Sequence, residues 1–200
     1  MNPLMSVKGA IVTGFVLAIL FAVFAVGGGW NELGLARWLH IISGITWIGL
    51  LYYFNTVQIP ALAEAAADKG GPGGAGISKY VAPRALLWFR WSALATWLTG
   101  AWYLLRSANF AGAFSLGMAG DEFSAYQFVI GTGAWLGTIM LFNVWVLIWP
   151  NQKKVLGIVA ASDEEKAKAR KTALLASRTN FVLSIPMLMC MAGAMHGVAF

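Results

Sequence analysis

Cysteine, histidine and charge are all scarce in this sequence. The 200 residues include one cysteine and two histidines, and only 11% carry a charged side chain. The single Cys190 excludes a disulfide or a multi-cysteine metal site within the chain. The few carboxylates are expected in loops, so we predict no catalytic set of nucleophile, base and acid.

Apolar residues dominate instead, at 59% of the chain, and the mean hydropathy is +0.70. Crossing a bilayer core takes about 20 apolar residues in a helix. The sequence therefore predicts an all-α integral membrane protein, a five-transmembrane-helix bundle forming a single membrane domain over residues 1–200. The predicted spans are approximately 8–28, 35–59, 83–105, 126–149 and 176–198. We expect the first to be retained as a span, because it lacks a clear signal-peptide cleavage site.

Basic residues predict the orientation of these spans. With the N-terminus in the cytoplasm, nearly all of them fall on the cytoplasmic side, which is the distribution expected of a bacterial inner membrane protein. They are Lys8, then Lys69, Lys79 and Arg84, then Lys153, Lys154, Lys166, Lys168, Arg170 and Lys171. The prediction is therefore N-in/C-out, and the net charge of +6 reflects topology and not nucleic-acid binding.

The fourth loop, residues 150–175, is predicted to be cytoplasmic. Ser162 followed by Glu165 has the spacing of a capping box. We expect a helix to begin there and to extend into the last span.

Both histidines are predicted in the outer half of the membrane. His40 follows the start of the second span by about one turn, and His196 lies in the last turn of the fifth. An intramembrane imidazole is costly unless it is used, so the two are candidate ligands of a metal or haem iron. Alternatively, His40 hydrogen-bonds a neighbouring helix and His196 reaches interfacial water.

Gly44 and Trp47 share a helix face with His40. Gly44 would let a flat cofactor ring, or instead a neighbouring helix, approach closely. Glycines at spacings near four elsewhere, Gly100, Gly131, Gly133 and Gly137, predict close helix packing.

Four polar residues are expected within the inner halves of the spans, namely Arg90, Asn143, Arg178 and Asn180. A cation with amides at similar depth could bind an anionic or quinone-like ligand. The alternative is that these side chains form hydrogen bonds between helices.

Three ordered motifs suggest a family. They are the run from Arg37 to Gly49 around Leu39-His40, the run from Trp88 to Trp91 with Thr96 to Gly100, and Gly137 to Met140 with Asn143 and Pro150 to Lys154. Together with the last helix, these motifs resemble the membrane domain of the bacterial cytochrome c-linked urate oxidase family over residues 35–200. A looser likeness extends to small haem-b membrane proteins such as the helical membrane-type protoporphyrinogen oxidase of bacteria.

In that wider group the histidine of this element ligates haem, so the resemblance implies haem b at His40. Fuller members of the urate oxidase family carry more membrane helices and a cytochrome c domain, whose Cys-x-x-Cys-His motif is absent here. Ser92 also stands where an acidic residue is typical. We therefore expect no independent urate oxidase activity from this chain.

Two functions follow from these observations. One is a small membrane electron-transfer protein that binds haem b and acts with a larger redox complex or a periplasmic electron carrier. The other is a cofactor-free accessory subunit of a multi-subunit membrane complex. A transporter is a weaker third option, because no inverted repeat is evident.

Overall fold

The computed structural model describes residues 2–25 and 29–198, and every regular element among them is helical. The helices are α1 (Val7–Leu20), α2 (Glu32–Tyr53), α3 (Ile59–Ala67), α4 (Ala82–Arg106), α5 (Phe110–Phe114), α6 (Ala125–Phe142), α7 (Trp149–Val155) and α8 (Asp163–His196). The chain divides into two compact units, Met1–Gly34 and Leu35–Phe200. This division does not decide whether residues 1–200 form a single membrane domain, which stays a prediction.

The first unit is built around α1. The Ser6 hydroxyl caps this helix by accepting a hydrogen bond from the Gly9 N–H, and a π-helical turn, Phe21–Ala25, extends it. None of the residues of this helix and turn is buried within the described part of the protein. The predicted first span, 8–28, matches this helix, except that residues 26–28 lie outside the described part of the chain.

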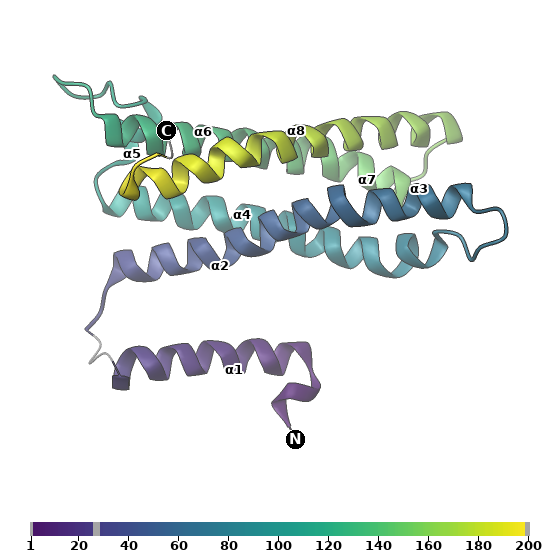
Figure 1. The fold of residues 1–200 in the computed structure, drawn as a ribbon, viewed down its shortest axis with the longest axis horizontal. Coiled ribbons are helices and arrows are strands. Elements are labelled where there is room, and N and C mark those ends of the chain that lie inside the picture. The colour runs from purple at the N-terminus through teal and green to yellow at the C-terminus, as the bar shows by residue number, and fades with distance from the viewer. Residues whose placement is uncertain (1, 26–28, 199–200) are drawn as a thin grey trace. The chain divides into compact units, whose positions relative to one another are not determined.

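The second unit is a bundle of long helices (Figure 1). The helix pair α2 and α3 forms one continuous rod, as does the pair α6 and α7, and α4 and α8 run beside them. The α3–α4 and α7–α8 connections lie at one end of this bundle (Figure 1). The start of α2 and the end of α8 lie at the opposite end.

Within residues 2–25 and 29–198, four helices are long and apolar enough to cross a membrane: Val7–Ala25, Glu32–Ala67, Ala125–Val155 and Asp163–His196. The predicted third span, 83–105, does form a helix, α4, of 25 residues. Among the described residues, α4 falls short of the hydropathy expected of a span, and it contains three arginines, Arg84, Arg90 and Arg106. The count of five spans therefore stays a prediction.

Three prolines lie just after π-helical turns. The turns Phe54–Gln58, Ile77–Val81 and Asn143–Ile148 precede Pro60, Pro83 and Pro150. A proline ring clashes with the carbonyl four residues earlier in an α-helix, and it donates no hydrogen bond. The wider turn moves that carbonyl away, so each helix continues through its proline instead of ending there.

The core of the bundle lies where four helical rods meet. Buried apolar side chains come from each of them: Trp47, Leu51 and Phe54; Leu86, Phe89 and Ala93; Met140, Val144 and Ile148; and Ala176 and Met187. Phe54 and Phe89 pack edge to face, with ring centroids 5.4 Å apart. These contacts join the α2–α3 rod to α4 across the centre of the bundle.

The capping box predicted at the start of α8 is confirmed. The Ser162 N–H donates to Glu165 Oε2 at 2.8 Å, and the Glu165 N–H donates to Ser162 Oγ at 3.2 Å. As predicted, α8 continues without interruption into the last apolar segment.

The glycine predictions hold at three positions and fail at one. A methyl group at Gly100 would meet the His40 ring, one at Gly131 would meet the Ala113 backbone, and one at Gly133 would meet Cys190 and Met191. At Gly137 no described atom lies within 4 Å of an added methyl group, so the prediction of close packing there is wrong. Gly137 itself is buried, but there is room for a methyl group beside it.

Gly131→Ala tests the close approach of α5 and α6. The new methyl group would overlap the Ala113 carbonyl, and backbone cannot rotate away as a side chain can. We expect a loss of about 1–3 kcal/mol in the free energy of unfolding in detergent. Gly137→Ala is the matched control, and its stability should stay equal or rise by up to about 1 kcal/mol, because alanine favours helix. Equal losses in both variants would contradict this packing.

Candidate functional site

His40 is held by a helix–helix hydrogen bond. Its Nδ1 lies 2.7 Å from the carbonyl oxygen of Thr96 on α4. A carbonyl can only accept, so Nδ1 carries the hydrogen and Nε2 keeps its lone pair. Within the described residues, Nε2 makes no hydrogen bond. The imidazole is thus fixed in the tautomer in which Nε2 can accept a hydrogen bond or ligate a metal.

The ring of His40 lies directly against Gly100. A Cβ added to Gly100 would be 2.9 Å from His40 Cε1 and 3.0 Å from Nδ1. One turn along α2, Gly44 also faces α4, and a Cβ added to it would lie 3.7 Å from Thr96 Cγ2. The α2 face that carries both residues is therefore packed on α4.

Trp47 lies on the same face of α2, two turns beyond His40. It is 2% exposed, and its indole Nε1 is buried without a hydrogen-bond partner in the described structure. Leaving a buried donor unpaired costs about 1–3 kcal/mol. Among the described residues, the face of His40 thus contains one unused acceptor, Nε2, and one unused donor.

His196 ends α8 and is exposed. The start of α2 and the end of α8 lie at the same end of the bundle (Figure 1), and the shared membrane depth of the two histidines stays a prediction. The described residues contain no group of three or more His, Cys, Asp or Glu side chains that could hold a metal ion. Any iron ligation would therefore rest on one or two imidazoles.

A second polar site lies where α6 meets α8. Asn180 is fully buried, its Nδ2 donates to the Met140 carbonyl at 2.9 Å, and its Oδ1 accepts from Asn143 Nδ2 at 2.8 Å. The carbonyl acceptor fixes which way each amide points. Two of the four predicted polar residues are thus brought together, as hydrogen-bond partners.

Asn55 brings the α2–α3 rod to the same face of α8. Its Nδ2 donates to the Leu51 carbonyl at 2.8 Å and to Ser177 Oγ at 3.0 Å. Its Oδ1 and the Oε1 of Gln58 are buried with no partner in the described structure. Amides of both rods therefore converge on one stripe of α8, formed by Ser177, Asn180 and Ser184.

The other two predicted polar residues lie elsewhere. Arg178 is exposed. Arg90 is half-buried, and its guanidinium stacks on the ring of Trp149, with Cζ 3.8 Å from the centroid. The predicted four-residue cluster is therefore divided among three places.

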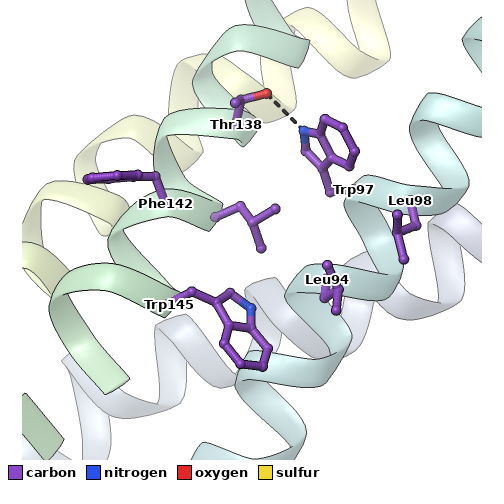
Figure 2. A pocket seen from close by; sticks show the side chains of 7 residues that line it. Leu94, Trp97, Leu98, Thr138, Phe142 and Trp145 are labelled. Carbon is purple, nitrogen blue, oxygen red and sulfur yellow. Dashed lines mark hydrogen bonds between the residues drawn. The ribbon is translucent and has the colours of Figure 1, made fainter. Parts of the chain in front are cut away.

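A groove of about 410 Å³ runs between α4 and α6 (Figure 2). It is lined by Leu94, Trp97, Leu98, Thr138, Leu141, Phe142 and Trp145. Trp97 Nε1 donates to Thr138 Oγ1 across it at 2.9 Å. His40 is not among its lining residues, so this groove is separate from the imidazole site.

Comparison with known protein families shows which family this chain belongs to. The family model described as Urate oxidase N-terminal matches twice, at residues 26–116 and at residues 107–200. The chain belongs to the urate oxidase N-terminal family. Neither a protein of curated function nor a solved structure matches it.

The double match to the urate oxidase N-terminal family has a counterpart in the residues. Trp47, Gly49, Phe54 and Asn55 recur at the same spacing as Trp135, Gly137, Phe142 and Asn143. In each copy a π-helical turn and a proline follow, and the asparagine donates to α8. Sequence reasoning missed Asn55, Gln58 and Ser177, although this internal repeat of Trp-x-Gly-x4-Phe-Asn could have pointed to Asn55.

Asn180→Ala tests the amide contacts on α8. It removes the acceptor of Asn143 Nδ2 and leaves that donor unpaired in the core. We expect a loss of about 1–3 kcal/mol in the free energy of unfolding. Asn151→Ala is the matched control: Asn151 is half-buried and bonds the Leu147 carbonyl of its own rod, so it should lose less than about 1 kcal/mol. A smaller loss for Asn180 than for Asn151 would contradict a central role for this amide.

Proposed function

We propose that this chain is a membrane electron-transfer domain that binds haem b through His40. The supporting observation is the hydrogen bond from His40 Nδ1 to the Thr96 carbonyl, which leaves Nε2 as the free nitrogen. A metal-bound histidine typically makes such a bond with its other nitrogen. A second support is the resemblance of the Leu39-His40 element to small haem-b membrane proteins.

Two nitrogen atoms on this face of α2 could interact with such a group, although α4 would have to move to admit a haem ring between the helices. Trp47 Nε1 is a buried donor with no partner in the described structure, two turns from His40 on the same face. An acceptor on a bound cofactor would satisfy it. Haem iron would supply one-electron transfer, which none of the protein side chains at this site supplies. Thr96 would keep the imidazole in its ligating tautomer, and Gly100 would leave room for it.

His196 is the proposed second ligand. It lies in the last turn of α8, at the end of the bundle where α2 begins (Figure 1). Its imidazole is exposed, so ligation would require no buried contact to be broken.

We also propose a five-span N-in/C-out topology in a bacterial inner membrane. The α3–α4 and α7–α8 connections lie at one end of the bundle (Figure 1). Most basic residues lie in the first connection or in the helix turns beside the two connections, and the rule on positive charge would place the cytoplasm at this end. The histidine end then faces the periplasm. A larger redox complex or a periplasmic electron carrier could exchange electrons there.

A cofactor-free accessory subunit is the second candidate. The contacts of Gly44 with Thr96 and of Gly100 with His40 favour it, because they close the α2 face with a helix. In this case the His40 hydrogen bond serves only to tie α2 to α4, and the protein docks on other subunits of a membrane complex.

The absorption spectrum of the purified protein separates the two functions. Under the haem proposal we expect a Soret band that is lost in His40→Ala, with unchanged helical circular dichroism. Thr56→Ala is the control and should keep the band, because the exposed Thr56 hydroxyl bonds the Tyr52 carbonyl of its own rod and does not contact His40 or Thr96. A colourless protein from haem-replete cells, co-purifying with a membrane complex, would overturn the haem proposal in favour of the accessory subunit.

His196→Ala tests the second ligand. Loss of one of two axial imidazoles should turn a six-coordinate low-spin spectrum into a high-spin one while haem stays bound through His40. An unchanged spectrum would show that His196 is not a ligand. Urate turnover measured on the same membranes is expected to be absent for this chain alone.

A further inference from the structure

Arg90 and the apolar groove between α4 and α6 lie on one continuous strip where the two helices face each other, which we call the seam. On α4, Arg90, Leu94 and Leu98 follow one another at intervals of four residues. On the facing rod, Thr138, Phe142, Trp145 and Trp149 are spaced by four, three and four. Residues at these intervals share a helix face. The contact of Arg90 with Trp149 therefore lies one turn below the groove that Leu94 and Trp145 line.

The surface of the groove is wholly apolar. Thr138 is engaged twice: its hydroxyl accepts from Trp97 Nε1 at 2.9 Å and donates to the Ala134 carbonyl at 2.8 Å (Figure 2). Trp145 Nε1 is buried and has no hydrogen-bond acceptor in the described structure. The groove has a volume of about 410 Å³ and is widely open along its length, as a surface that an acyl chain lies against would be.

Two cations meet at the lower end of the seam. The Arg90 guanidinium and Lys153 Nζ lie 3.8 Å and 5.9 Å from the centre of the same Trp149 ring. The hydrogen bond from Arg90 Nη1 to the Leu86 carbonyl is long at 3.5 Å. The ion pairs in the described part of the chain that involve nearby lysines are Lys154 with Glu165 and Lys166 with Asp163. No described carboxylate pairs with Arg90 or Lys153.

We propose that this seam binds one anionic phospholipid. Its phosphate would lie at Arg90 and Lys153, and an acyl chain would lie in the groove. A half-buried guanidinium with no carboxylate among the described residues favours an anionic over a zwitterionic headgroup, since a phosphate can take two of its N–H donors at once. A basic pocket between helices on the cytoplasmic side is a known kind of site for anionic headgroups.

The lipid site is independent of the haem proposal. It uses none of the residues that hold or surround His40, and the groove does not include that imidazole. A protein without haem can therefore still bind the lipid, and a protein without the lipid can still show a haem spectrum.

Native mass spectrometry of the detergent-purified full chain tests the proposal. Phosphatidylglycerol and phosphatidylcholine with identical acyl chains are titrated separately, and glycerol phosphate serves as a headgroup without a chain. We expect one phosphatidylglycerol to bind at least about tenfold more tightly than phosphatidylcholine, and glycerol phosphate not to displace it. Equal affinities for the two lipids would overturn the proposal. Displacement by glycerol phosphate at the same concentration would show a free-phosphate site instead.

Variants locate the bound lipid. Arg90→Gln should weaken phosphatidylglycerol binding about tenfold and leave phosphatidylcholine binding unchanged. Arg84→Gln is the matched control, because Arg84 is exposed on the same helix and bonds the Tyr80 carbonyl, and it should change affinity less than about twofold. Equal effects of the two substitutions would overturn the site in favour of diffuse surface charge.

Leu98→Trp tests the groove without changing charge. The larger side chain would fill the space meant for the acyl chain, so both lipids should bind about tenfold more weakly. Leu98 is about half exposed, so the fold should tolerate the change, which circular dichroism verifies. Unchanged phosphatidylglycerol affinity in this variant would overturn the placement of the chain.

Discussion

The fully buried amide of Asn180 is the contact on which the bundle most depends. Its two hydrogen bonds, to Asn143 and to the Met140 carbonyl, join α8 to α6 at the centre of the protein. Asn55 reaches the same stripe of α8 through Ser177. Between apolar helices in an apolar solvent, hydrophobic burial cannot fix which faces meet. Buried amides can fix which faces meet, because only one register of the helices satisfies their hydrogen bonds. In any other register they would stay unpaired.

Pro60 and Pro150 also bear on the placement of the amides that contact α8. Pro60 and Pro150 would end or kink an ordinary α-helix, yet the π-helical turns before them let both rods continue. Asn55 and Asn143 lie in those turns, where the wider helix changes the direction of the side chains that follow. The repeated Trp-x-Gly-x4-Phe-Asn element thus places two amides on one helix. This gives the double match to the urate oxidase N-terminal family a structural meaning.

Around this framework, three nitrogen atoms make no hydrogen bond among the described residues, and Arg90 has no carboxylate partner there. His40 Nε2 and Trp47 Nε1 lie on one face of α2, whereas Trp145 Nε1 and Arg90 lie on the α4–α6 seam. Burying such groups is costly, so their retention in a chain with so little charge points to use. The first pair suits a cofactor with an electron-transfer role. The second suits an anionic lipid.

The sequence by itself determined the helical class, the extents of most helices, the capping box at Ser162 and the family, because hydropathy, capping and local motifs act over a few residues. It also singled out His40, Arg90, Asn143 and Asn180. Only the tertiary structure decided their partners: Thr96 for His40, Trp149 for Arg90, and each other for the two asparagines. It also revealed Asn55 and Ser177, which lie 122 residues apart in the chain. Such pairs depend on the rotation of each helix about its own axis, and packing between helices sets that rotation.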